Sequence, residues 1–90
     1  MKEKIEHLLR RNTWETEDAQ QEVVKYLKSI QEYTAKALEK AAGGDTWNEV
    51  DWIENHVGHL RKAQDKLNQL GNERVKLNWL LKEAEGGGKA

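Results

Sequence analysis

Residues 41–49 read Ala-Ala-Gly-Gly-Asp-Thr-Trp-Asn-Glu, and this stretch decides how the 90-residue chain folds. Gly43-Gly44 predicts the end of a helix, because glycine takes the left-handed cap conformation at no steric cost. Thr46 and Glu49 have the spacing of a capping box, which predicts the start of the next helix. Because so short a link leaves no room for a crossover, the two helices must run antiparallel as a helical hairpin.

The segment before the link has the periodicity of a helix that buries one stripe. Its apolar and small residues recur at alternating intervals of four and three, which is typical of a coiled-coil seam. The predicted seam consists of Val23, Leu27, Ile30, Thr34, Ala37 and Ala41. This pattern predicts a helix that ends at about residue 42.

A helix boundary is expected at Asn12. The charge reverses there, from the basic pair Arg10-Arg11 to an acidic stretch, and Glu15 follows Asn12 at capping-box spacing. We therefore expect a short helix over residues 2–11 and a second helix over residues 13–42. One unbroken helix beginning at Lys2 is the alternative.

One long helix is predicted after the link, over residues 46–85. Its apolar positions form two stripes that are expected to slip around the helix after Leu60, and Gly71-Asn72 is a possible kink. The stripes consist of Val50, Ile53, Val57, Leu60, Ala63, Leu67, Leu70, Leu77, Leu81 and Ala84. Residues 86–90 are expected to form a flexible, glycine-rich tail.

Four tryptophans lie near the ends of the expected hairpin. We expect Trp14, Trp47 and Trp79 to plug its ends as core residues. Trp52 lies beside the apolar stripe, so both a core position and an exposed anchor for a partner remain open for it.

Composition excludes several classes of protein. Charged residues make up 34% of the chain and the net charge is -1, so neither a membrane-spanning helix nor the basic face of a nucleic-acid-binding protein is expected. No cysteine is present, which excludes disulfides and thiolate metal sites. The opening residues lack the apolar stretch of a signal peptide, so we expect a cytoplasmic protein.

Two helices cannot enclose all the apolar residues of this chain, since each helix buries one stripe and leaves its flanks in water. The short first helix covers one end at most. The apolar residues left over are Val24, Tyr26, Tyr33, Leu38, Trp52, Leu70 and Leu80. They predict a partner-binding surface, covered by a second copy in a homodimer or by a helical partner, which completes a three- or four-helix bundle.

Metal-ligand spacing occurs only at His56 and His59, which point the same way on a helix, with Glu32 as a conceivable third ligand across the hairpin. Solvated or partner-facing histidines are the simpler interpretation. Ser29 is the only serine and has no neighbouring base, and no glycine-rich phosphate loop is present. We therefore expect neither catalysis nor a cofactor.

In layout, the chain resembles the WXG family of small secreted helical hairpins: two long helices, a Gly-Gly link and no cysteine. This resemblance implies a heterodimer with a second hairpin. The chain departs from the family because the link lacks Trp-x-Gly and the C-terminal part lacks the tyrosine of the secretion signal. Residues 46–51 also look like the start of the C-terminal heptad region of lentiviral envelope transmembrane subunits, over six residues only.

The sequence thus predicts an all-α, non-enzymatic protein-protein interaction module, such as a small accessory, inhibitor or adaptor protein of phage or bacterial type. A WXG-type heterodimer and an engineered or metal-binding bundle are the alternatives.

Overall fold

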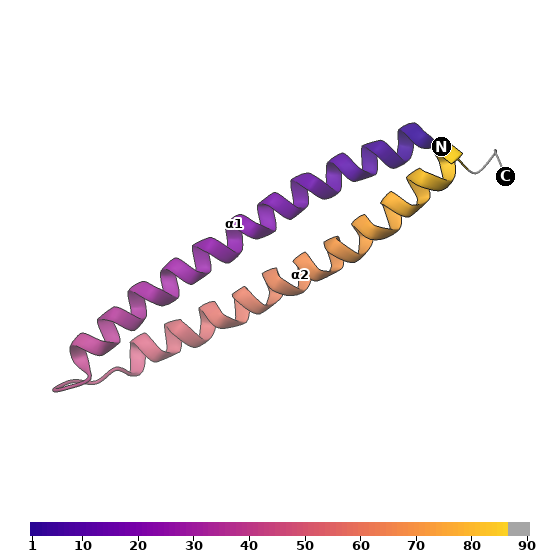
Figure 1. The fold of residues 1–90 in the computed structure, drawn as a ribbon. Helices are drawn as coiled ribbons and strands as arrows, with labels where there is room; N and C mark the ends of the chain where they lie inside the picture. The colour runs from indigo at the N-terminus through magenta and orange to yellow at the C-terminus, as the bar shows by residue number, and fades with distance from the viewer. Residues whose placement is uncertain (87–90) are drawn as a thin grey trace.

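A computed structural model describes residues 1–86 as an all-α hairpin of two long helices (Figure 1). Helix α1 spans Lys2–Lys40 and helix α2 spans Trp47–Gly86. The hairpin is a rod of 73 × 16 × 13 Å, with both ends of the described chain at one tip and the turn at the other. Of the expected tail, residues 87–90 lie outside the described part.

The helix boundary predicted at Asn12 is wrong, because α1 continues through it without interruption. Asn12 is 1% exposed, and its side chain reaches across to α2 instead of capping a helix. Arg11 and Glu15, which flank the charge reversal, form an ion pair one turn apart within α1. The reversal therefore stabilises a continuous helix.

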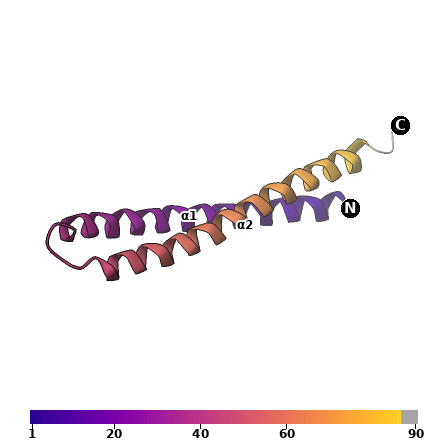
Figure 2. The ribbon, with the colours of Figure 1, turned by 90° about the horizontal axis from the view of Figure 1, so that it is seen from below.

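The two helices meet along a seam of buried and half-buried residues, which recur at alternating intervals of three and four along each helix. On α1 the seam comprises Ile5, Leu9, Asn12, Thr16, Ala19, Val23, Tyr26, Ile30, Tyr33 and Ala37. On α2 it comprises Glu49, Ile53, His56, Leu60, Ala63, Leu67, Leu70, Leu77 and Leu81, and the position between Leu70 and Leu77 is taken by the exposed Arg74. This repeat averages 3.5 residues, which makes helices coil around each other, and Figure 2 shows α2 crossing α1.

The seam of α1 has a different phase from the predicted one. Leu27, Thr34 and Ala41 are exposed, and Tyr26 and Tyr33, one position earlier, lie in the seam. On α2 no slip of the stripe occurs, because His56 fills the seam position between Ile53 and Leu60. Helix α2 continues without a break through Gly71 and ends at Gly86.

The turn uses hydrogen bonds that differ from the predicted caps. The backbone N–H groups of Gly43 and Gly44 both donate to the carbonyl oxygen of Lys40, and no glycine of the described chain has a positive φ. At the start of α2, the carboxylate of Asp45 accepts a hydrogen bond of 2.9 Å from the backbone N–H of Trp47. Asp45 therefore performs the capping role that we expected of Thr46 and Glu49.

Contacts between the helices fix their register. Lys2 pairs with Glu85 at the open end, and Lys40 pairs with Glu49 at the turn.

Across residues 1–86, neither helix has a stretch long and apolar enough to span a bilayer.

Candidate interaction surfaces

Five aromatic and histidine rings form a ladder across the half of the hairpin nearer the turn. Tyr26 stacks on His59 with ring centroids 5.3 Å apart, and Tyr33 stacks on Trp52 at 5.8 Å with planes 6° apart. His56 lies between these two pairs, 5.8 Å from Tyr26 and 5.7 Å from Tyr33. The ladder lies beside the aliphatic seam residues Ile30 and Ile53, and it joins α1 to α2 through ring stacking.

The ladder also explains the two histidines that were considered as metal ligands. His56 and His59 stack against tyrosines, while Glu32 forms an ion pair with Lys36 on its own helix. No group of three or more metal-ligating side chains comes together within residues 1–86. In that part of the chain, the histidine pair belongs to the packing between the helices.

A buried polar contact joins the helices nearer the open end. The Asn12 amide nitrogen donates to the carbonyl oxygen of Leu70 at 2.9 Å and to Glu73 at 3.3 Å. Next to it, an Arg74 guanidinium nitrogen donates to the hydroxyl of Thr13 at 3.0 Å. A single buried asparagine in a coiled-coil seam fixes register at some cost in stability, and Asn12 has the geometry for this role.

An ion pair closes the other end of the seam. Glu49 is 6% exposed, and one of its carboxylate oxygens accepts a hydrogen bond from the Lys40 ammonium group. This hydrogen bond lowers the pKa of Glu49 below its usual value of 4.5 and raises the pKa of Lys40 above its usual value of 10.5. The second carboxylate oxygen of Glu49 is buried without a hydrogen-bond partner.

Many of the largest apolar side chains lie on the surface. Trp14 is 78% exposed, Trp47 69% and Trp79 59%, so the prediction that they plug the ends of the core is wrong. The buried apolar core of the described chain is small and consists of Ile5, Ala19, Ala63, Leu70 and Leu77. Because the rod is only two helices thick, its ends have no interior in which an indole could be buried.

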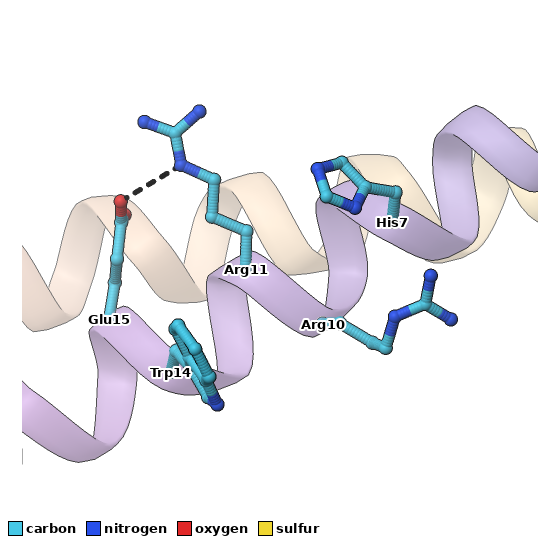
Figure 3. A pocket seen from close by; sticks show the side chains of 5 residues that line it. All are labelled: His7, Arg10, Arg11, Trp14 and Glu15. Carbon is cyan, nitrogen blue, oxygen red and sulfur yellow. Dashed lines mark hydrogen bonds and ion pairs between the residues drawn. The ribbon is translucent and has the colours of Figure 1, made fainter.

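The surface around Trp14 forms a depression on the outer side of α1 (Figure 3). Its volume is about 480 Å³, and it is lined by His7, Arg10, Arg11, Trp14 and Glu15. All five residues lie on one helix, and Figure 3 shows their side chains spread along its surface. Such a site offers an aromatic ring beside two guanidinium groups, a combination that protein interfaces favour.

The residues predicted to bind a partner occupy three kinds of position. Leu38 is 72% exposed, and Val24 and Leu80 are close to half exposed. Tyr26, Tyr33 and Trp52 take part in the ring ladder. Leu70, at 5%, is buried in the seam.

Sequence reasoning missed Asn12 and Glu49 as seam residues, and it missed the ion pair between Lys40 and Glu49. Asn12 lies seven residues from both Ile5 and Ala19, so a heptad count through this polar residue would have found it. For Lys40 and Glu49, heptad counting predicts the side of the helix on which each residue lies, but their pairing depends on the path of the turn.

No family model matches this chain, and comparison with curated proteins and with solved structures found no match. Within residues 1–86, the molecule is an antiparallel helical hairpin with a small buried core and large exposed apolar side chains.

Proposed function

We propose that this hairpin is a non-enzymatic protein-protein interaction module that binds through apolar side chains on its surface. The observation that carries the proposal is the exposure of Trp14, Trp47 and Leu38, each more than two-thirds exposed. Leaving such side chains in water forgoes about 1.5–3 kcal/mol each relative to burial. Tryptophan is also enriched among the residues that dominate binding energies.

The shape of the chain supports the same proposal. The accessible surface is 7234 Å², whereas a compact protein of 10.4 kDa would expose about 5,400 Å². The rod presents its surface along its whole length, which suits docking beside other helices.

Site-specific photo-crosslinking in the cells that produce the protein tests the proposal. A photoreactive residue at Leu38 is expected to give discrete protein adducts, because this side chain would lie in an interface. The same residue at the exposed, charged position Lys62 is the matched control and is expected to give few adducts. Equal labelling at the two positions, or no adduct at either, would contradict the proposal.

A further inference from the structure

The two broad faces of the hairpin differ in charge. From Thr13 to Asn78, the residues directly after every second seam position form one face, which we call the uncharged face. It comprises Thr13, Gln20, Leu27, Thr34 and Ala41 on α1, and Val50, Val57, Gln64, Gly71 and Asn78 on α2. At the open end of the rod the same pattern continues to two charged residues, Glu6 and Glu85. In a chain of which 34% of residues are charged, ten positions without a charge form a distinct surface.

These ten residues share one side of the rod. On the other side of the rod, the flank of α1 that contains Leu8 and Glu15 lies next to the flank of α2 that contains Glu73, because the three residues line one common depression. Trp52 and His59, on that same flank of α2, stack on tyrosines of α1. With 3.5 residues per turn, the residues directly after the seam positions then lie together on the other side.

The uncharged face is accessible in the isolated hairpin. Leu27 is 49% exposed and Val50 is 43% exposed. A Cβ added to Gly71 would have no neighbouring atom within 4 Å. The opposite flank contains Glu15, Glu22, Lys36, Lys66 and Glu73. On the uncharged face, the Arg74 guanidinium reaches only the polar end, where it donates to the hydroxyl of Thr13.

We infer that the uncharged face binds the uncharged face of a second copy, giving a four-helix bundle of two hairpins related by a two-fold axis. None of the ten residues of this face carries a charge that pairing would desolvate, and the Arg74 guanidinium beside Thr13 lies at the edge of the paired region. From Thr13 to Ala41 the face is about 42 Å long, and the rod that carries it is 16 Å across its wider side. Two such faces bury about 1,300 Å² in total, which is within the range of stable protein interfaces.

The distribution of apolar residues selects the orientation of the two copies. On the uncharged face, Leu27, Ala41, Val50 and Val57 lie in the half nearer the turn, and polar residues and Gly71 occupy the other half. Apolar residues meet apolar residues when both turns are at the same end of the bundle. In that arrangement, α1 of one copy lies over α2 of the other, which places Thr34 of one copy near Val50 of its partner copy.

Charge substitutions test the interface itself, and the inference rests on the proposed function. In sedimentation equilibrium from micromolar to millimolar concentration, the natural chain is expected to approach twice its monomer mass. Leu27→Glu and Thr34→Glu should each weaken the dimer about tenfold or more, because each buries a carboxylate. Gln69→Glu adds the same charge on the other side of the rod and should leave the dimer unchanged. Because Thr34 is polar and exposed, Thr34→Glu is expected to fold, and it therefore still tests the interface if Leu27→Glu fails to fold.

Disulfide trapping tests the orientation, and the absence of natural cysteines makes single-cysteine variants clean probes. A mixture of Thr34→Cys and Val50→Cys chains should form the mixed disulfide preferentially under air oxidation. Preferential trapping of Thr34→Cys with Gln20→Cys would place the turns at opposite ends and would overturn the orientation.

The outcomes separate this inference from the proposed function. A natural chain that stays monomeric at millimolar concentration, or that forms trimers, overturns the two-fold dimer. Crosslinks from Leu38 to a different protein would still support an interaction module in that case. If the chain is monomeric and Leu38 also gives no adduct, both ideas fail.

Discussion

The side-chain amide of Asn12 donates a hydrogen bond of 2.9 Å to the carbonyl oxygen of Leu70, inside the seam between the two helices. Glu73 accepts from the same amide nitrogen, and the hydroxyl of Thr16 lies 3.5 Å from the amide oxygen. This contact lies among aliphatic seam residues, where burial of an amide without a hydrogen-bond partner would destabilise the fold. It therefore favours the register in which Asn12 reaches Leu70 over registers shifted along the seam.

Asn12→Leu is expected to raise the free energy of unfolding by about 1 kcal/mol, because a buried amide is replaced by an apolar side chain of similar volume. The carbonyl of Leu70 stays within a continuous helix, so it keeps its place in the backbone hydrogen-bond ladder. Urea denaturation followed by circular dichroism measures this change.

The same variant is expected to lose uniqueness of register. Its backbone amide NMR spectrum should show more than one set of peaks, whereas the natural chain should show one. A variant that is less stable than the natural chain would show that Asn12 contributes more as a hydrogen-bonding group than it costs as a buried amide.

The Lys40–Glu49 pair predicts an acid-sensitive contribution to stability. The pKa of Glu49 is lowered in the folded state, so its contribution is present above the usual value of 4.5 and is lost as pH falls through the folded-state pKa. Glu49→Gln should therefore melt below the natural chain at pH 7, and the difference should shrink progressively below pH 4.5.

The basic side of the same pair follows the opposite rule. The pKa of Lys40 is raised in the folded state, so its contribution is present below the usual value of 10.5 and is lost as pH rises through the folded-state pKa. Thermal melts of the natural chain and of Glu49→Gln across the pH range check both limbs. A melting difference that is independent of pH would contradict an ionic origin.

The Tyr33–Trp52 stack predicts a coupled contribution to stability. Trp52→Ala should lower the free energy of unfolding by about 1–2 kcal/mol, since the indole is about half buried against the tyrosine ring. A double-mutant cycle with Tyr33→Ala should give a coupling energy of about 0.5–1.5 kcal/mol. Trp47→Ala, at a position 69% exposed, is the matched control and should change stability little.

Glycine positions give a contrasting pair of predictions. Gly58→Ala should stabilise the chain by about 0.5–1 kcal/mol, because alanine is the better helix former and its Cβ meets no atom within 4 Å. Gly44→Ala should lower the stability of the chain. The new Cβ would lie 3.3 Å from the carbonyl oxygen of Lys40, the last residue of α1. Thermal denaturation of the two variants checks the opposite signs.

The ring ladder shows why the candidate surfaces were only partly predictable. Tyr26 and Tyr33 were expected on the flank of the stripe, as surplus apolar residues available to a partner. In the structure their rings stack on His59 and Trp52 of the other helix. Such pairings depend on which residues the register brings opposite each other, and a single helix does not contain that information.

By itself, the sequence determined a helix on each side of the Gly43-Gly44 link and the antiparallel course of the two helices, because periodicity and the link act locally along the chain. The continuity of α1 from Lys2 was not determined in this way, because Asn12 has the local pattern of a helix cap. Only the tertiary structure decided which stripe of α1 faces α2. Stripes through Val23 and Leu27 or through Val23 and Tyr26 both satisfy a three-and-four spacing, so one helix alone leaves the choice open. The choice was made by the partner helix, because the rings of Trp52, His56 and His59 pack on tyrosines rather than on Leu27.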